Sequence, residues 1–149
     1  IDAAADAVRE VAHGLSPRIL SEQGLGPALE ELAAGLPVET EVNWAGRAGA
    51  GAPSPSDEAS EDLYLIASEA ITNAMKHSEC SRIEVDVARR DDVVQLTVRD
   101  DGAGGAAPTG RGILSMAARA RRLGGTFELV SPDGGPTTVT VRIPSGGPR

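Results

Sequence analysis

The sequence predicts an α+β fold, a two-layer α/β sandwich in which helices cover one face of a single mixed sheet. The chain has 149 residues, enough for one domain with a continuous core. Segments with helical and strand periodicity follow in the order strand, helix, strand pair, glycine-rich loop, helix, strand pair, an order typical of a sheet covered by helices. Apolar residues make up 40% of the chain and aromatic residues 2%, which indicates a core of small, branched side chains.

The first two predicted elements are helices. From Ile1 to Leu15, apolar residues recur at helical spacing and predict an amphipathic helix, which Pro17 interrupts. A second, shorter helix is expected to begin around Pro27, because proline suits the first helical turn.

A strand, a loop and a long helix come next. Apolar and polar side chains alternate from Val38 to Trp44, which is the period of a half-buried strand. The segment from Ala45 to Ser56 is rich in Gly, Ala, Pro and Ser and predicts a loop. Helix signals restart at Pro55 and continue to about His77.

The second half of the chain is expected to contain two strand pairs and one helix. Strands are predicted from Ile83 to Val87 and from Val93 to Arg99, joined by a polar turn. After the glycine-rich segment, a helix is predicted from Ile113 to Leu123, where Gly124-Gly125 suits its C-terminus. The last strands are expected at Thr126 to Val130 and Thr137 to Ile143.

Charge and composition exclude several classes of function. A formal net charge of -8 opposes general binding to nucleic acid or to an anionic membrane, since both begin with a basic surface. A phosphate ligand would have to be held locally, together with a cation. The single cysteine, Cys80, allows no internal disulfide and no cysteine cluster for zinc, in agreement with a reducing cytoplasmic compartment.

The sequence contains no apolar run near the roughly 20 residues that cross a bilayer, and its first residues are too polar for a signal peptide. We therefore expect a soluble, cytoplasmic piece. Because it starts at Ile1 without a methionine, we interpret it as an excerpt from a longer protein, which could itself be anchored in a membrane.

Four polar residues gather on one side of the helix that contains EAITNAMKHS. At about 100° per residue, Glu69, Asn73, Lys76 and His77 share an arc of about 100°, beside an apolar arc that would face the sheet. An amide oxygen is a hard ligand suited to Mg²⁺, an adjacent carboxylate can orient a metal-bound water, and Lys76 and His77 can donate hydrogen bonds to phosphate oxygens. Taken alone, the motif also fits an ordinary solvated helix face.

Two glycine-rich motifs follow. Asp100 ends a strand and is followed by Gly102 and Gly104, which let backbone approach a ligand, although DDGAGG alone is also a routine turn. Gly110-Arg111-Gly112 then leads into a helix, whose free N–H groups can bind an anion. A GxxxxGK[ST] motif does not occur, which excludes a P-loop.

In this order, EAITNAMKHS, RDDGAGG, GRGILSMAARARRLGG and TTVTVRIP resemble the N, G1 and G2 boxes and closing strand of the histidine kinase catalytic domain, within the GHKL ATP-binding superfamily. The upstream stretch VREVAHGLSPRILSEQGLGPALEELA resembles the second dimerisation helix and linker of the subfamily whose response regulators carry LuxR-type domains. The resemblance implies the Bergerat ATP-binding fold over residues 37–149, and the end of the dimerisation helix with its linker over 1–36.

The resemblance also implies roles for residues of the helix motif and the turn. Asn73 would bind Mg²⁺, and Glu69 would orient a metal-bound water or the incoming histidine. Lys76 and His77 would contact the phosphates of ATP. Asp100 would accept a hydrogen bond from the adenine amino group.

Four glycines and one threonine complete the implied ATP site. Gly102 and Gly104 would shape the adenine side, whereas Gly110 and Gly112 would border a lid that is mobile without nucleotide. Thr137 matches a family threonine near adenine. It follows a proline here, where the family often has Gly-Thr, and the lid is short.

The phospho-accepting histidine is expected upstream of Ile1. His13 is followed by Gly14 rather than by the acidic residue typical of the subfamily, and Pro17 is close behind.

The implied activity is transfer of the γ-phosphate of ATP to a histidine on the dimerisation helix of a homodimer, with relay to an aspartate of a response regulator. Two alternatives stay open at this point: an anti-sigma-type serine protein kinase of the same superfamily, and a module that binds nucleotide or a partner without catalysis.

Overall fold

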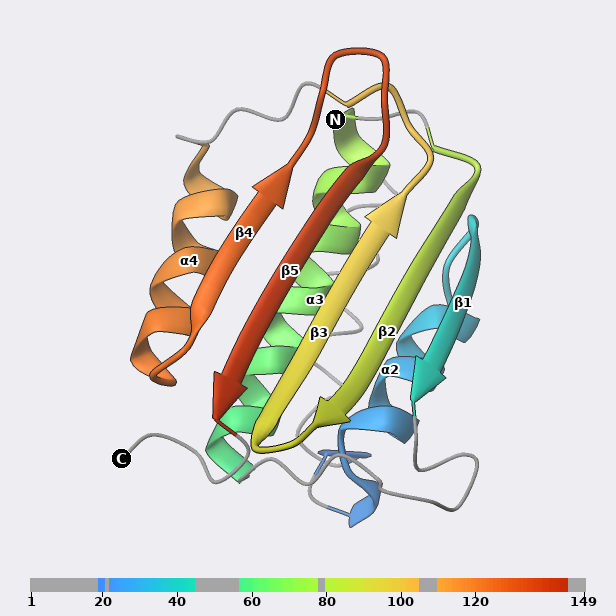
Figure 1. Cartoon of the computed structure of the whole chain (residues 1–149). Coiled ribbons are helices and arrows are strands. Elements are labelled where there is room, and N and C mark those ends of the chain that lie inside the picture. The colour runs from blue at the N-terminus through green and yellow to red at the C-terminus, as the bar shows by residue number, and fades with distance from the viewer. Residues whose placement is uncertain (1–18, 21, 45–56, 78–79, 105–109, 145–149) are drawn as a thin grey trace.

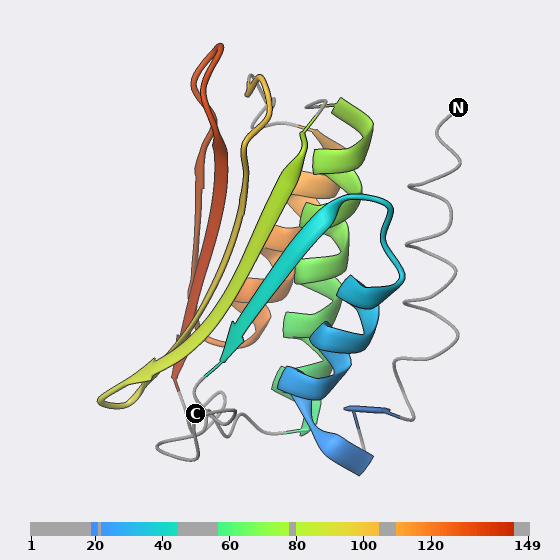
Figure 2. The same cartoon turned by 90° about the vertical axis from the view of Figure 1, so that its right-hand side faces the viewer.

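The computed structural model describes residues 19–20, 22–44, 57–77, 80–104 and 110–144. Its five-stranded sheet has helices on one face only, so the molecule has two layers (Figures 1 and 2). This confirms the predicted α/β sandwich. In chain order the elements are α2 (Leu25–Ala34), β1 (Glu39–Trp44), α3 (Asp57–His77), β2 (Arg82–Arg90), β3 (Val93–Asp100), α4 (Arg111–Arg122), β4 (Thr126–Val130) and β5 (Thr137–Pro144).

The strand order in the sheet is β1-β2-β3-β5-β4. Strand β1 runs parallel to β2, and the other neighbours are antiparallel. The parallel pair is possible because α3 lies between the two strands in sequence and returns the chain across the sheet. Strand β3 lies in the centre, so its C-terminal residue, Asp100, sits between Ile83 of β2 and Thr137 of β5.

The core lies between the helices and one face of the sheet. Along β3, Val94, Leu96 and Val98 are buried, and the residues between them are more exposed. Helix α3 runs behind the central strands (Figure 1) and contributes several of the largest buried side chains. These are Leu63, Tyr64, Ile66 and Ile71.

Helix α2 packs on the same core beside the edge strand β1. A side chain at Gly26 would put its Cβ 2.3 Å from the Trp44 ring, so only glycine lets that ring lie against the helix. The Trp44 Nε1–H donates a hydrogen bond to Glu30 Oε1 over 2.9 Å. Together these contacts join α2 to β1.

Several element boundaries differ from the predictions. Helix α2 begins at Leu25 rather than around Pro27, with Gly24 as its N-cap at a φ of 92°. Helix α4 begins at Arg111 instead of Ile113, because the Gly110 carbonyl already accepts a hydrogen bond from the Leu114 N–H over 2.9 Å.

Strand β2 continues three residues beyond its predicted end, to Arg90, since its last residues pair with the start of β3. The turn between them places Asp91 at a φ of 54°.

The predicted helix at 1–15 and the predicted loop at 45–56 lie outside the described residues. Among the described helices, none combines the length and the apolar character that a membrane crossing requires.

Candidate functional site

The facing sides of α3 and α4 bring three of the predicted site residues together. Glu69 and Asn73 lie four residues apart on α3, and both are half-buried. A Cβ built on Gly112, in the first turn of α4, would lie 2.4 Å from Glu69 Oε1 and 3.3 Å from Asn73 Nδ2. The start of α4 is therefore in contact with both polar side chains, and any residue larger than glycine would displace Glu69.

Asp100 lies at the end of β3, on the helix-covered face of the sheet. It continues the buried series of β3 and is 5% exposed. Its Oδ1 accepts a hydrogen bond from the Gly102 N–H over 2.8 Å, which holds the carboxylate at the start of the glycine-rich segment. A carboxylate withdrawn from bulk water in this way is a strong acceptor for a ligand N–H group.

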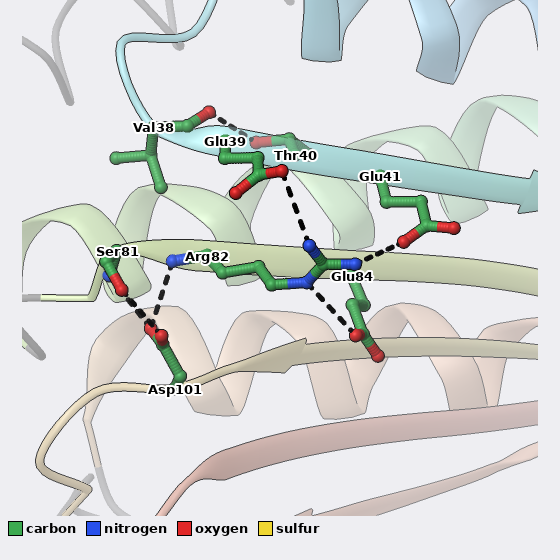
Figure 3. Close-up of polar contacts among 8 residues, drawn as sticks. All are labelled: Val38, Glu39, Thr40, Glu41, Ser81, Arg82, Glu84 and Asp101. Atoms are coloured by element: carbon green, nitrogen blue, oxygen red, sulfur yellow. Dashed lines mark hydrogen bonds and ion pairs between the residues drawn. The ribbon is translucent and has the colours of Figure 1, made fainter.

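Asp101 points away from the core and performs a different task (Figure 3). Its Oδ1 accepts from the backbone N–H groups of Ser81 and Arg82, at 2.8 and 3.0 Å, and its Oδ2 accepts from the Ser81 hydroxyl at 2.7 Å. The Ser81 hydroxyl, followed by the two backbone donors, lowers the pKa of Asp101 from its ordinary value of 3.8. Asp101 thus ties the end of β3 to the start of β2.

The Arg82 side chain forms a separate ion-pair group on the open face of the sheet (Figure 3). It pairs with Glu39 and Glu41 of β1 and with Glu84 of its own strand. The hydrogen bond with Glu84, followed by the charge of Glu39, raises the pKa of Arg82. This group links the edge strand to β2.

The turn between β4 and β5 supports the glycine-rich segment. Gly104 has a φ of +71°, and a Cβ there would lie 1.9 Å from the Pro132 carbonyl oxygen. The Gly134 N–H donates to the Ala103 carbonyl over 2.7 Å. Glycine is therefore required at 104 by the neighbouring backbone.

Thr137, which pairs with Asp100 across the sheet, has its Oγ1 2.7 Å from Ser131 Oγ. The structure thus places four of the predicted site residues close together at the end of β3: Asp100, Gly102, Gly104 and Thr137.

Two cavities border these residues. One, of about 370 Å³, lies mainly on the open face of the sheet, where Arg82, Glu84, Arg99 and Asp101 line it; Asp100, Gly102 and the turn between β4 and β5 form the rest of its wall. The other, of about 130 Å³, lies between α3 and α4 and has Glu69 in its wall.

Lys76 is exposed near the end of α3. Gly110 is the N-cap residue of α4, and among the described residues no side chain donates or accepts a capping hydrogen bond there. The side chain of His77, residues 105–109 of the expected lid, and His13 all lie outside what the structure describes.

A metal ion would depend on few protein ligands here. The described part of the chain contains no group of three or more His, Cys, Asp or Glu side chains that could hold a metal. Asn73, with Glu69 one helical turn away, suits a hard cation that takes its remaining ligands from phosphate oxygens and water.

Two charged residues that hold the elements of this region together were not singled out from the sequence. Asp101 could have been noticed as the second acid of the Asp-Asp-Gly turn. Asp62 is the other: it is buried in α3 and forms ion pairs with Arg119 and Arg122 of α4. Its position among polar residues early in α3 offered no signal of burial.

Comparison with known proteins relates the chain to one family. The family model described as "Histidine kinase-, DNA gyrase B-, and HSP90-like ATPase" matches residues 58–147. The nitrate/nitrite sensor protein NarX of Escherichia coli is 38% identical over 132 residues, which cover 82% of this chain and 21% of NarX. The sensor histidine kinase MctS of Rhizobium johnstonii is 29% identical over 149 residues, covering 95% of this chain and 32% of MctS. The chain thus spans between about a fifth and a third of these relatives.

Solved structures share the fold. The histidine kinase domain of the blue-light activated histidine kinase from Erythrobacter litoralis aligns with a TM-score of 0.62 and 22% identity, over 80% of this chain and 64% of that one. The histidine kinase AdeS of Acinetobacter baumannii aligns with a TM-score of 0.60 and 18% identity, over 94% of this chain and 64% of that one.

Proposed function

The chain belongs to the family of histidine kinase-, DNA gyrase B- and HSP90-like ATPases, and on that premise we propose that it is the ATP-binding catalytic domain of a sensor histidine kinase. The observation that carries the proposal is that Glu69 and Asn73 on α3 contact Gly112 at the start of α4. Family relatives named as sensor histidine kinases support this activity over a serine kinase or a non-catalytic module.

The proposed nucleotide site has an adenine end and a phosphate end. At the adenine end, the buried Asp100 accepts a hydrogen bond from the exocyclic amine, with Gly102, Gly104 and Thr137 around it. At the phosphate end, Gly110 and Gly112 bring the positive start of α4 toward Asn73.

Two further side chains would complete the phosphate end. Lys76 and His77 follow Asn73 on α3 and would donate hydrogen bonds to the phosphates.

Mg²⁺ is the cation we propose, with Asn73 as its protein ligand. When bound, it neutralises part of the phosphate charge and so favours phosphoryl transfer. Glu69, beside Asn73, would orient a water or the incoming imidazole by accepting its hydrogen bond.

In the proposed reaction a histidine nitrogen forms a bond to the γ-phosphorus while the bond from that phosphorus to the β–γ bridging oxygen breaks. ADP leaves with the bond's electron pair, and the imidazole gives its ring N–H proton to Glu69 or to the water that Glu69 orients, which leaves a neutral phosphohistidine ring. Positioning and charge stabilisation are the main catalytic resources in this chemistry, and the contact of Gly112 with Glu69 and Asn73 supplies positioning.

The partners follow from this activity. We propose that the acceptor histidine lies on a dimerisation helix upstream of Ile1, that the whole protein works as a homodimer, and that the phosphoryl group passes to an aspartate of a response regulator. Residues 1–36 would be the end of the dimerisation region and its linker, and 37–149 the catalytic domain; a cytoplasmic location accords with ATP as substrate.

Incubation with γ-labelled ATP, with and without a histidine helix of the parent protein added in trans, tests the proposal. We expect acid-labile label on the added helix alone. Asn73→Ala should abolish it, whereas Asn43→Ala, on the exposed face of β1, should not. Label on the chain alone, lost in His13→Ala, would make His13 the acceptor, and ATP binding without any transfer would support the non-catalytic alternative.

A further inference from the structure

Asp62 is a buried charge in α3 that bonds to α4. Its side chain is 3% exposed. Its Oδ1 accepts hydrogen bonds from Arg119 Nη1, at 2.9 Å, and from Arg122 Nη2. Its Oδ2 is buried and has no hydrogen-bond partner among the described residues.

Asp62 lies on the same stripe of α3 as the site residues. Asp62, Glu69 and Asn73 are separated by seven and then four residues, which places them on one side of a helix. On α4, Gly112 contacts Glu69 and Asn73, and Arg119 contacts Asp62. Gly112 and Arg119 are also seven residues apart, and they contact α3 in the reverse order, so the two helices run antiparallel. Their contacts therefore lie at two levels, about 10 Å apart along the helix axis.

The space between these two levels is only partly filled. The cavity of about 130 Å³ between α3 and α4 lies there, walled by Leu65, Ser68, Glu69, Thr72, Ser115, Met116 and Arg119. Where side chains do not interlock, packing alone constrains sliding of one helix along the other less tightly. The contacts at the two ends therefore act together with the buried Met116 and Ala120 to set how far α4 is advanced along α3.

The Asp62 group is poorly explained as a stabilising device. Burying a carboxylate costs desolvation, and here one of its oxygens recovers no hydrogen bond. Replacing a buried ion group with apolar side chains is often neutral for stability or favourable. What apolar side chains do not reproduce is the directional bonding of one oxygen to two guanidinium groups.

We propose that Asp62 is a positioning residue: through Arg119 and Arg122 it fixes the advance of α4 along α3, and so keeps Gly112 against Glu69 and Asn73. The inference rests on the proposed function, because it assigns Asp62 to the phosphate end of the same nucleotide site. It acts through α4 and does not touch the nucleotide.

The test compares transfer to a supplied histidine helix with nucleotide binding. In Asp62→Asn, KM for ATP and the Kd for ADP should stay within about threefold, because the adenine end is untouched. The value of kcat should fall at least tenfold, on the scale of the roughly hundredfold loss that a 1 Å misplacement can cause. Arg121→Ala is the matched control: this arginine is exposed on α4, and its Nε–H donates a hydrogen bond to the Ala117 carbonyl of its own helix.

A second variant keeps the test informative if Asp62→Asn does not fold. The triple substitution Asp62→Leu, Arg119→Leu, Arg122→Leu replaces the whole group with apolar side chains. It should fold and bind ADP but transfer slowly, with faster hydrogen exchange at Leu114, whose N–H donates to the Gly110 carbonyl. Transfer at the unmodified rate in any folded Asp62 variant would overturn the inference and leave the proposed function intact. Absence of nucleotide binding or transfer by the unmodified chain would overturn both.

Discussion

At the scale of single residues, neighbours in sequence have unrelated tasks. Asp100 is the last residue of β3 and Asp101 directly follows it, so their side chains point in opposite directions. One is buried at the proposed adenine end, and the other ties two strand ends together. The strand period predicts the two faces from sequence, whereas the choice of Asp100 as the adenine reader came from the resemblance to the histidine kinase catalytic domain. The partners of Asp101 could not be predicted, because they depend on how β2 is aligned with β3.

Asp101 gives a pH-dependent contribution to stability. Because its hydrogen bonds lower its pKa in the folded chain, the contribution is present above the ordinary value of 3.8 and is lost as the pH falls through the folded value. Denaturant unfolding between about pH 5 and about pH 2 should therefore show a smaller pH dependence for Asp101→Asn than for the unmodified chain. Asp92→Asn, in the exposed turn between β2 and β3, serves as the control. Identical pH profiles for Asp101→Asn and the unmodified chain would refute this role.

Gly112 is the second residue for which the structure predicts a sharp effect. The Cβ of Gly112→Ala would lie 2.4 Å from Glu69 Oε1, so either Glu69 or α4 must move. We expect transfer to a supplied histidine helix to fall by about tenfold or more, since catalysis here depends on placement. Gly35→Ala is a suitable control, because its new Cβ would meet only the Leu32 carbonyl oxygen at 3.8 Å. Equal transfer rates for the two variants would count against the site as described.

At the scale of elements, hydrophobic periodicity predicted the helices and strands of the described chain, but not where several of them end. The end of β2 depends on pairing with β3 across a turn at Asp91, and the start of α4 depends on the carbonyl of Gly110. Both boundaries depend on backbone hydrogen bonds, which the pattern of side chains does not predict. The helical wheel correctly placed Glu69 and Asn73 on one arc, but it could not say that α4 would face them.

The glycine-rich segment from Gly104 to Gly112 is the element for which we predict a response to nucleotide. Its small residues offer little apolar area to offset the entropy of ordering, so its amides should exchange rapidly without ligand. Addition of ADP or ATP with Mg²⁺ should slow that exchange, while the amides of Val94 to Val98 in the central strand stay protected throughout. A segment that is strongly protected before nucleotide is added would disagree with this expectation.

At the scale of the whole molecule, the fold class was predictable and the topology was not. The order of segments indicates one sheet with helices, whereas the strand order β1-β2-β3-β5-β4 and the parallel pairing of β1 arise from long-range contacts. The same holds for Asp62, whose burial depends on two arginines 57 and 60 residues away in sequence. Motif order led to the proposed ATP site because the three motifs lie on elements that pack together, with α3 in contact with both β3 and α4.

Calorimetric titration with ATP and Mg²⁺ tests the central claim most directly: that the chain binds a nucleotide with Asp100 at the adenine end of the site. The unmodified chain should bind ATP at one site. Asp100→Asn should bind roughly 10- to 100-fold more weakly, because a charge-assisted hydrogen bond contributes about 1.5–3 kcal/mol. Asp92→Asn, at the opposite end of β3, should bind like the unmodified chain. No detectable binding of ATP, or equal affinity in Asp100→Asn and the unmodified chain, would contradict the account.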